Sequence, residues 1–315
     1  MEVIASPLEM QQTALGLRQA GKRIGLVPTM GFLHEGHLSL VRLARAQSDI
    51  VILSIFVNPT QFGPNEDFKE YPHDFERDRA LCAAAGVDII FNPSLEAMYP
   101  AIAPSVAQRA MDGGQGTMAD KMAGRPAGYA VYLEPGDLAH GLCGAARPGH
   151  FRGVLTVVAK LFNLTMPTVA VFGQKDAQQL RLIEQMVRDL NFPIAIVRAP
   201  IVRESDGLAK SSRNTYLSPA ERRESLCLMQ ALKTARNLYR KGERAAPRII
   251  EAMQALIESV ASAHVDYVAI VDADTLEPVP RLEAPALVAL AVYIGKTRLI
   301  DNLTLPDDGA SNLPE

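Results

Sequence analysis

The sequence predicts an α/β protein, with a doubly wound parallel sheet followed by a second, smaller α+β domain. The chain has 315 residues, which is more than one hydrophobic core usually supports, so roughly two domains are expected. Short runs rich in Val and Ile alternate with helical stretches over residues 1–201, whereas helices precede three consecutive strand-like runs over residues 202–315. We therefore expect one domain in each of these two ranges.

Five apolar runs are predicted to form the parallel sheet. They lack polar alternation, which suits strands that are buried on both faces. The runs span residues 23–27, 50–57, 87–91, 169–172 and 194–197. Helices are predicted before and between them, at residues 6–21, 36–47, 74–85, 153–163 and 177–190. This βαβ alternation is typical of a Rossmann-like sheet.

Residues 202–315 carry the pattern of a small α+β domain. A capping-box pattern at Ser218, Pro219 and Glu221 starts a long predicted helix that Gly242 should end, and a second helix is predicted over residues 247–261. Strands are predicted at residues 265–271, 286–293 and 297–303. Residues 306–315 are predicted to be a loose tail.

Residues 101–130 fit neither pattern. This stretch is rich in Ala, Gly and Met, with Gly113, Gly114 and Gly116 at its centre, and it shows little periodicity. A structureless connection of this length is unusual in a compact domain, so it is either a mobile functional loop or a disordered insertion. We expect a disordered insertion.

Composition and charge limit the kinds of partner. The formal net charge is −3 and the basic residues are spread along the chain, so nucleic acid is a poor candidate partner. Cys82, Cys143 and Cys227 lack the C-x-x-C spacing of a zinc or redox site. The longest apolar stretch, residues 285–294, is about half of what a membrane-spanning helix needs. The amino terminus lacks the layout of a signal peptide, so we expect a cytoplasmic protein without a membrane partner.

The segment after the first predicted strand is a candidate phosphate site, because ligands of open α/β sheets bind beyond the carboxyl ends of the strands. Pro28, Thr29, Met30 and Gly31 follow this strand. A helix is expected to start at about Gly36, where glycine permits close backbone approach and free N–H groups favour anions.

His34 and His37 stand three residues apart at this helix start, which places both imidazoles on one side and suits a polyphosphate. Zinc is a weaker interpretation, because a His-Glu-x-x-His site needs a spacing of four on a continuous helix and Gly36 interrupts this one. For the segment taken alone, two surface histidines in a turn are a further interpretation.

Amide side chains follow the second strand. Asn58 and Gln61 share the expected rim and can both donate and accept hydrogen bonds, which suits the carboxylate and hydroxyls of a small polar substrate. For Asn58, an Asx-type turn around Pro59 is an equally good interpretation.

The fourth strand is followed by Gly173, Lys175 and Asp176, and Gln179 lies in the opening turn of the next helix. Lys175 would supply a point charge for phosphate, and Asp176 would orient Lys175 or bind Mg²⁺. The alternative is an exposed Lys–Asp pair that caps the helix, which is the commoner outcome for such a pair taken singly.

The last candidate segment follows the fifth strand, near Val202 at the expected domain junction. Ser211 and Ser212 stand between Lys210 and Arg213, so two hydroxyls and two cations form a hydrogen-bonding cup for pyrophosphate. Taken alone, this loop could be a solvated linker. Four strand ends that all carry phosphate-compatible or amide groups indicate one shared site.

These segments resemble a known family. Residues 28–37 resemble the nucleotide-binding signature of the class I synthetase and nucleotidyltransferase superfamily. Four further motifs resemble the pantothenate synthetase family: Phe-Val-Asn-Pro-x-Gln-Phe at 56–62, Arg-Pro-x-His-Phe at 147–151, Gly-x-Lys-Asp-x-Gln-Gln at 173–179 and Asp-Gly-x-x-x-Ser-Ser-Arg-Asn at 206–214. The resemblance covers about residues 4–303, and five motifs in one order make it highly specific.

The resemblance implies condensation of pantoate with β-alanine through a pantoyl-adenylate, with ATP split to AMP and pyrophosphate and Mg²⁺ required. It implies a lid role for the second domain and a homodimer, and it leaves the metal ligands unknown. The residues implied in catalysis are His34, His37 and Lys175, and those implied in substrate binding are Gln61, Gln179 and Asn58. The residues implied in ATP binding are Pro28, Thr29, Met30, Gly31, Gly36, Gly173, Lys175, Asp176, Val202, Lys210, Ser211, Ser212 and Arg213.

Two positions depart from the family pattern, and two other functions are open. Gln174 stands where the family usually has Glu, and Lys210 stands where an apolar residue usually precedes the serines. Another adenylyltransferase of the superfamily would share the histidine motif without needing Gln61 and Gln179 as a pair. A catalytically silent nucleotide-binding protein could use residues 101–130 to recruit a partner, although the retained phosphate-facing residues argue against it. A tRNA-charging enzyme is disfavoured by length and charge.

Overall fold

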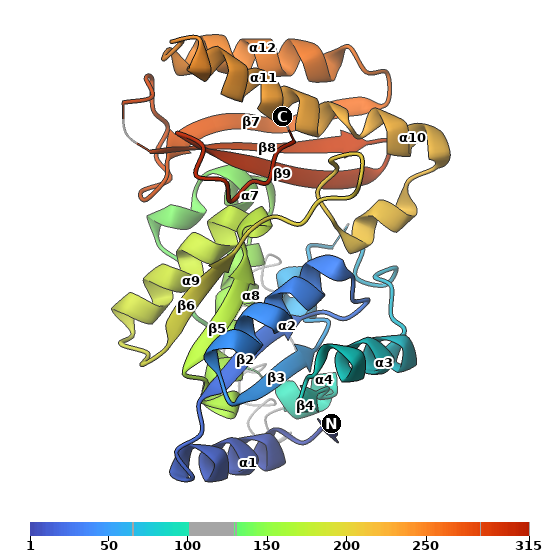
Figure 1. The fold of residues 1–315 in the computed structure, drawn as a ribbon, viewed down its shortest axis with the longest axis vertical. Coiled ribbons are helices and arrows are strands. Elements are labelled where there is room, and N and C mark those ends of the chain that lie inside the picture. Colours follow the sequence, from blue (N-terminus) through green and yellow to red (C-terminus); the bar gives the residue numbers. More distant parts are fainter. Residues whose placement is uncertain (65, 101–128, 130, 284, 315) are drawn as a thin grey trace, which may run out of the picture.

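Two sheets organise the part of the chain that the structure describes (Figure 1). This computed structural model describes residues 1–64, 66–100, 129, 131–283 and 285–314. A six-stranded parallel sheet with helices on both faces forms the larger part, and a three-stranded sheet covered by helices forms the smaller one. The predicted fold class is therefore confirmed. The insertion predicted at 101–130 lies, apart from Tyr129, outside the described residues.

All neighbouring strands of the larger sheet are parallel, in the order β1-β4-β3-β2-β5-β6. The strands are β1 (Glu2–Ile4), β2 (Ile24–Thr29), β3 (Ile50–Ile55), β4 (Ile89–Phe91), β5 (Val169–Gly173) and β6 (Ala195–Ala199). The order turns back at β2, since β3 and β4 follow on one side and β5 and β6 on the other. β1 is not among the predicted strands, because it is three residues long and buries only Ile4.

Helices cover both faces of this sheet because successive strand residues point to opposite sides. Leu26 belongs to one apolar cluster and the next residue, Val27, belongs to the other. The first cluster includes α1 (Pro7–Gln19), α8 (His150–Thr165) and α9 (Ala177–Asp189), and the second includes α2 (Glu35–Gln47) and α3 (Phe75–Ala85). Shorter elements are α4 (Leu95–Met98), α7 (Leu142–Ala146) and the 3₁₀ turns η1 (Pro59–Gln61), η2 (Asp137–Ala139) and η3 (Gln174–Asp176).

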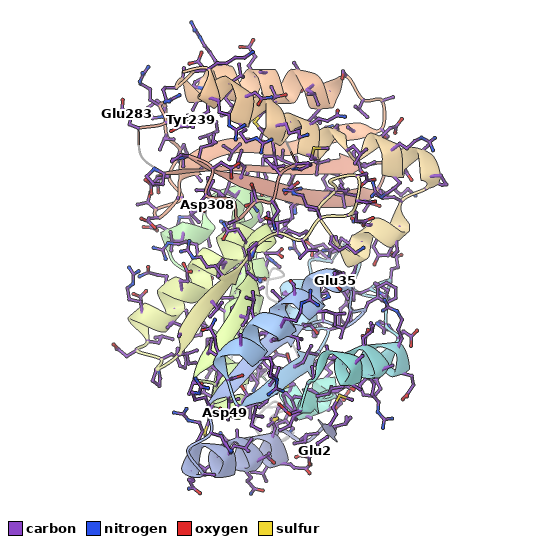
Figure 2. All side chains as sticks on the ribbon, in the orientation of Figure 1. Glu2, Glu35, Asp49, Tyr239, Glu283 and Asp308 are labelled. Atoms are coloured by element: carbon purple, nitrogen blue, oxygen red, sulfur yellow. The ribbon has the colours of Figure 1, made fainter. Side chains whose placement is uncertain are left out.

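The carboxyl ends of the parallel strands face the second sheet. Figure 2 labels Glu35, at the start of α2, and Asp49, just before β3. Glu35 lies towards the second sheet, whereas Asp49 lies at the opposite end, near α1 (Figure 2). Since α2 follows β2 in the chain, the connection between them also lies at the edge that faces the second sheet.

The smaller sheet is antiparallel and buries both of its faces at the central strand. Its strands, in spatial order, are β7 (Ala263–Asp272), β8 (Ala286–Ile294) and β9 (Thr297–Leu305). On one face, Val288 and Leu290 pack with α11 (Cys227–Arg240) and α12 (Ala246–Glu258). On the other face, Leu287 and Ala289 pack with Leu142 of α7. The second face therefore forms an apolar contact with the larger part of the molecule.

The single long helix predicted over residues 218–242 is wrong. The structure has two helices there, α10 (Pro219–Glu224) and α11, with a turn at Ser225 and Leu226 between them. The Ser225 hydroxyl donates to Arg222 O at 2.7 Å, and Leu226 N donates to Arg223 O at 3.3 Å. A serine hydroxyl that competes for helical carbonyls weakens the helix ladder at this point.

The loose tail predicted for residues 306–315 is also wrong over its described part. Ile201 N donates to Ala310 O at 2.8 Å, and the Arg236 guanidinium donates to Pro314 O at 2.6 Å. Arg236 is 5% exposed, and among the described residues its two Nη groups find their partners in the tail. These contacts leave no periodic signal in the sequence.

Gly153 of α8 packs against η1 with no room for a side chain, since a Cβ there would stand 2.3 Å from Thr60 O. We expect Gly153→Ala to lower the free energy of unfolding by about 1–3 kcal/mol, the usual cost of overpacking. Gly16→Ala in α1 is the matched control. A Cβ at Gly16 meets nothing within 4 Å, so this change should raise the free energy by about 0.5–1 kcal/mol. Urea denaturation checks both, and an unchanged midpoint for Gly153→Ala would contradict this packing.

Candidate active site

The turn after β2 contains two consecutive residues with left-handed backbone conformations. Gly31 has φ 84° and Phe32 has φ 50°. Glycine adopts this region freely, whereas a residue with a side chain does so rarely. The Thr29 hydroxyl donates to Ser54 O at 2.7 Å and accepts from Gly31 N at 3.2 Å. Pro28 and Thr29 are the last residues of β2. The Thr29 hydroxyl hydrogen-bonds within the protein and stabilises the turn.

The first turn of α3 contacts this turn. The Asp78 carboxylate accepts from Phe32 N at 2.6 Å and from Leu33 N at 2.7 Å. Arg77 donates to Leu33 O at 2.9 Å, and its guanidinium lies 4.9 Å from the centre of the Phe32 ring. Burial raises the pKa of Asp78, against the opposing effect of the two backbone hydrogen bonds. Neither residue was predicted, because Asp78 lies 46 residues from Phe32 in the chain.

His34 and His37 lie together at the N-terminus of α2, with their rings stacked and the ring centroids 4.0 Å apart. His34 Nδ1 accepts from Gly36 N at 3.1 Å, and His37 Nδ1 accepts from His34 N at 3.3 Å. Since each Nδ1 is an acceptor, each neutral ring carries its proton on Nε2. The pair therefore offers two Nε2–H donors.

The two imidazoles are neutral at neutral pH. Burial, together with the charges of His37 and Lys175, lowers the pKa of His34 to about 2. Burial and the charge of Lys175 lower the pKa of His37 to about 4.

Two expectations for this helix start need correction. The N–H groups of His34 and Gly36 are taken by imidazoles, and Gly36 makes room for the His34 ring, since a Cβ there would stand 2.8 Å from His34 Cε1.

Lys175 belongs to η3, which follows β5 beside the histidine turn. Because β5 pairs with β2, η3 and the histidine turn leave the sheet side by side, and the Lys175 charge lowers the pKa of both imidazoles. Asn302 of β9 donates to Gln174 O at 3.0 Å and to Lys175 O at 2.9 Å. Among the described residues, no hydrogen bond or ion pair engages the Lys175 ammonium. The sheet therefore brings Lys175 to the histidines, and the second sheet fixes its backbone.

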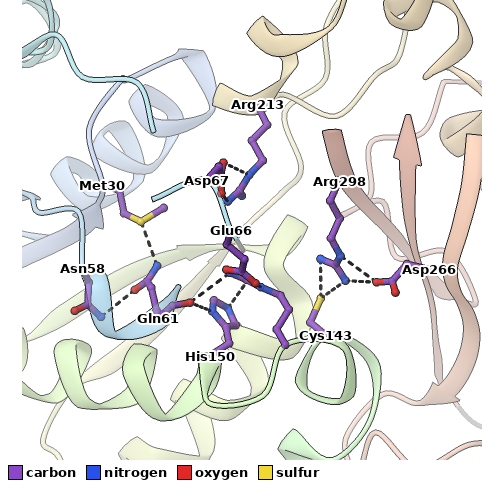
Figure 3. Close-up of polar contacts among 11 residues, drawn as sticks. Met30, Asn58, Gln61, Glu66, Asp67, Cys143, His150, Arg213, Asp266 and Arg298 are labelled. Carbon is purple, nitrogen blue, oxygen red and sulfur yellow. Dashed lines mark hydrogen bonds and ion pairs between the residues drawn. The ribbon is translucent and has the colours of Figure 1, made fainter. Parts of the chain in front are cut away.

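Gln61 lies beside Met30, and its Nε2 donates to Met30 Sδ at 3.1 Å (Figure 3). Asn58 is 1% exposed and donates to Gln61 Oε1 at 3.2 Å and to a main-chain carbonyl of α8 at 3.1 Å. Asn58 Oδ1 accepts from the hydroxyls of Thr60, at 2.9 Å, and Tyr99, at 2.8 Å. All four hydrogen-bonding positions of this amide are used, so Asn58 orients Gln61 and has none left for a substrate.

A charged network holds the backbone of Gln61 from the other side (Figure 3). His150 Nδ1 donates to Gln61 O at 2.8 Å, and its Nε2 accepts from Arg147 at 2.9 Å. Arg147 also pairs with both carboxylate oxygens of Glu66, at 2.7 and 2.6 Å. Burial first, and then the Arg147 charge, lowers the pKa of His150 to about 3. Of these residues, the motif at 147–151 pointed to Arg147 and His150, and nothing in the sequence pointed to Glu66.

The predicted phosphate cup lies at and before η4 (Ser212–Tyr216). The Ser212 hydroxyl donates to Phe32 O at 3.3 Å, which joins this loop to the histidine turn. The Ser211 hydroxyl accepts from Arg213 N at 3.3 Å. Arg213 pairs with both carboxylate oxygens of Asp67, at 2.9 and 2.8 Å (Figure 3). Its predicted contact with phosphate therefore requires exchange of this carboxylate for ATP.

Lys210 and Val202 lie behind the cup as backbone partners. Lys210 N donates to Val202 O at 2.8 Å, which closes a short loop. The charge of Lys210 also contributes to the lowered pKa of His34. Lys210 therefore lies near the start of α2, since a Cβ built at Gly36 would stand 3.8 Å from Lys210 Cβ.

A cavity of about 680 Å³ lies between the two sheets. Five predicted residues line it, namely Lys175, Asp176, Gln179, Ser211 and Arg213. Its wall in the second sheet includes Tyr267 and Arg298. The Cys143 thiol lies 3.2 Å from the Tyr267 hydroxyl. It also lies 3.6 Å from Arg298 Nη2 (Figure 3). In the described part of the chain, the histidine pair and Gln61 are not on this wall. They adjoin it through Lys175 and His150.

Metal and membrane features are limited in the described residues. No three His, Cys, Asp or Glu side chains gather there to hold a metal ion. Asp176 is the N-cap residue of α9, and its side chain makes no capping hydrogen bond. Its carboxylate could therefore add one ligand to a metal ion whose other ligands are mostly ATP oxygens. No helix in the described ranges is both long and apolar enough to cross a bilayer.

The fold and the groups at the carboxyl ends of β2 and β5 define a phosphate-binding α/β enzyme. The strand order turns back at β2, and open α/β sheets bind nucleotides at such a point. There the described residues present two Nε2–H donors together with Lys175 and Lys210, whose ammonium groups make no hydrogen bond or ion pair within the described chain. This equipment stabilises charge on phosphate groups.

Comparison with known proteins identifies the family. The family model for pantoate-beta-alanine ligase matches residues 2–304. The pantothenate synthetase of Moorella thermoacetica is 52% identical over 305 residues, which are 97% of this chain and 99% of that protein. The pantothenate synthetase of Thermotoga neapolitana is 50% identical over 305 residues, which are 97% of this chain and 100% of that protein.

Solved structures agree with this match. A crystal structure of pantothenate synthetase from Thermus thermophilus has a TM-score of 0.83 and 42% identity, and the match covers 96% of this chain and 99% of that one. A crystal structure of pantoate-beta-alanine ligase from Francisella tularensis, complexed with beta-gamma ATP and beta-alanine, has a TM-score of 0.69 and 32% identity, with coverage of 96% and 97%. The chain belongs to the pantoate–β-alanine ligase family, which confirms the resemblance seen in the motifs.

The histidines of the site should resist protonation. The pKa values of His34, His37 and His150 are lowered to about 2, 4 and 3, so we expect their Cε1–H NMR signals not to titrate from about pH 8 to about pH 5. The unfolded chain binds protons at these residues near pH 6.5 and the native chain does not, so stability should fall as the pH drops below about 6.5. His→Gln variants assign the signals. A midpoint near 6.5 for any of the three would contradict their burial.

Proposed function

We propose that this chain condenses pantoate with β-alanine in two steps, through a pantoyl-adenylate, with release of pyrophosphate and AMP. The observation that carries the proposal is the convergence of His34, His37 and Lys175 at the carboxyl ends of β2 and β5. Membership of the pantoate–β-alanine ligase family and the ATP and β-alanine bound to the Francisella tularensis relative support the same reaction.

The first step needs charge stabilisation and alignment, and it needs no general base. The pantoate carboxylate is already ionised at neutral pH when it attacks the α-phosphorus of ATP. Lys175 supplies positive charge, and the Nε2–H groups of His34 and His37 donate to phosphate oxygens as their charge grows. Donors fixed before ATP arrives need no rearrangement during the reaction.

Pantoate is assigned to the amide side chains of Gln61 and Gln179. Gln179 lines the cavity and Gln61 lies next to Met30. Asn58 and the His150–Arg147 network fix the side chain and the backbone of Gln61, respectively. We assign them positioning roles.

We assign residues 202–315 to the second domain. We also assign this domain the role of a lid that covers the acyl-adenylate, because water would otherwise hydrolyse this intermediate. Two kinds of contact with the larger domain support this role. Leu142 packs in an apolar cluster with Leu287 of β8, which suits a lasting contact. The Arg213–Asp67 pair and the Ser212 contact with Phe32 are polar and suit exchange when ATP binds.

Mg²⁺ would offset part of the polyphosphate charge when ATP is bound. Asp176 is the residue that we assign to it, since its carboxylate adjoins Lys175 at the cavity wall. A homodimer is proposed from the family resemblance alone, and a cytoplasmic location is proposed from the sequence features described above.

The reaction is tested by incubating the protein with ATP, Mg²⁺ and pantoate, with and without β-alanine. We expect multiple-turnover AMP release only when both acids are present, measured by nucleotide chromatography. Lys175→Ala should slow adenylate formation by about 100-fold because it removes a fixed charge at the phosphates. Pyrophosphate release with a nucleotide or phosphopantetheine replacing pantoate would indicate another adenylyltransferase. Absence of ATP cleavage with any carboxylate would indicate a silent nucleotide-binding protein.

The amide pair is tested by Gln61→Ala and Gln179→Ala. Each should raise KM for pantoate by about 10-fold or more, because a lost hydrogen bond to a charged group costs about 1.5–3 kcal/mol. KM for ATP should change little. Gln185→Ala is the control on α9, since the Gln185 amide donates its one hydrogen bond within the described residues to Asp189 and does not line the cavity. Equal pantoate KM values in all three variants would remove the two glutamines from the pantoate site.

A further inference from the structure

Asp78 is a buried carboxylate that the proposed mechanism does not use. It is 1% exposed, and both of its oxygens accept from the backbone of the histidine turn, at 2.6 Å from Phe32 N and 2.7 Å from Leu33 N. These two residues come immediately before His34. Hydrogen bonds to a carboxylate are among the stronger ones in proteins, and this pair is shielded from water.

The turn requires support from outside its own sequence. Phe32 has φ 50°, and a non-glycine residue keeps a left-handed conformation only where surrounding contacts over-determine it. Gly31 leaves space for the carboxylate, since a Cβ there would stand 3.1 Å from Asp78 Oδ2. Arg77 adds a hydrogen bond to Leu33 O at 2.9 Å. Three contacts from one helical turn thus fix the backbone of two residues.

The backbone of Phe32 and Leu33 leads directly into the two hydrogen bonds that orient the imidazoles. His34 follows Leu33, and His34 N donates to His37 Nδ1 at 3.3 Å. Gly36 N donates to His34 Nδ1 at 3.1 Å. A shift of Leu33 would move His34 N, and the His37 ring would then lose the donor that keeps its proton on Nε2.

We propose that Asp78, with Arg77 beside it, is a positioning residue that sets the orientation and the Nε2–H tautomer of His34 and His37 for the phosphates of ATP. The kinetic consequence rests on the proposed function. The tautomer consequence does not, because it is a property of the protein without substrate.

Asp78→Asn replaces one acceptor oxygen by an NH₂ group that faces a backbone N–H. We expect kcat/KM for ATP in adenylate formation to fall by about 10–100-fold, the scale of a misplaced reacting group. KM for pantoate should stay within about twofold, since Gln61 is held by Asn58 and His150. Long-range ¹H–¹⁵N NMR spectra should show mixed tautomers for the two rings, where the wild-type chain shows Nε2–H alone.

Asp74→Ala is the matched control on the same helix. Asp74 caps α3 by accepting from Arg77 N at 3.1 Å, so its loss weakens the start of the helix and removes no contact with the histidine turn. This variant should keep wild-type kinetics and ring spectra. An equal kinetic loss in Asp74→Ala would mean that α3 only supports the fold, and wild-type ring spectra in Asp78→Asn would also overturn the proposal.

Arg77→Gln carries the test if Asp78→Asn does not fold. The Arg77 side chain is 43% exposed, so its replacement is compatible with folding, and it removes the donor to Leu33 O. A lower kcat/KM for ATP together with mixed ring tautomers would support the proposal. Wild-type values of both would overturn it. If no variant or wild-type chain cleaves ATP while the tautomers still shift, the proposed reaction fails and the positioning role stands.

Discussion

Parallel pairing of β2 with β5 is the constraint on which the rest of the site depends. Gly25 pairs with Val169 and Leu26 with Ala170, so two strands that are distant in the chain end side by side. One leads into the histidine turn and the other into η3 with Lys175. Gly25 also lets α2 approach the sheet, since a Cβ there would stand 2.5 Å from Ser48 Oγ. The position of the first turn of α2, and of its two imidazoles, follows from this packing.

Residues that follow β6 in the chain contact both the connection after β2 and the connection after β5. Asn302 of β9 holds the carbonyls of Gln174 and Lys175, and the Ser212 hydroxyl reaches Phe32 O. Asn302 is 3% exposed, so separating its amide from these carbonyls without new partners costs the full desolvation penalty. Movement of the second sheet therefore acts directly on the lysine turn, and movement of η4 acts on the histidine turn. In the proposed reaction, where residues 202–315 act as a lid, these contacts would link movement of the lid to both turns.

The sequence predicted the fold class and the main elements because long apolar runs and helical periodicity report burial directly. It left two interpretations of Asn58 open, a substrate ligand and an Asx-type turn, and the structure supports neither. The Asn58 side chain makes no capping bond at η1, and its amide is taken up by groups that include Tyr99 and a carbonyl of α8, both distant in the chain. Asp78 and Asn302 escaped prediction for a related reason, since a single polar residue has no period and its role depends on contacts 46 and 127 residues away. Residue types therefore indicated the chemistry of the site, whereas tertiary contacts determine which groups face a ligand and which hold their neighbours.

Neutral imidazoles fit a site that already contains cations. The charges of Lys175 and Lys210 oppose protonation of His34, and two protonated rings with centroids 4.0 Å apart would repel each other. The neutral Nε2–H groups instead donate directional hydrogen bonds, and the two rings do not repel each other or the lysines. A bound polyphosphate would favour the protonated form, because a nearby anion raises the pKa of a base. Positive charge on these rings would then increase only when phosphate is present, so the site avoids a buried excess of like charge in the absence of its ligand.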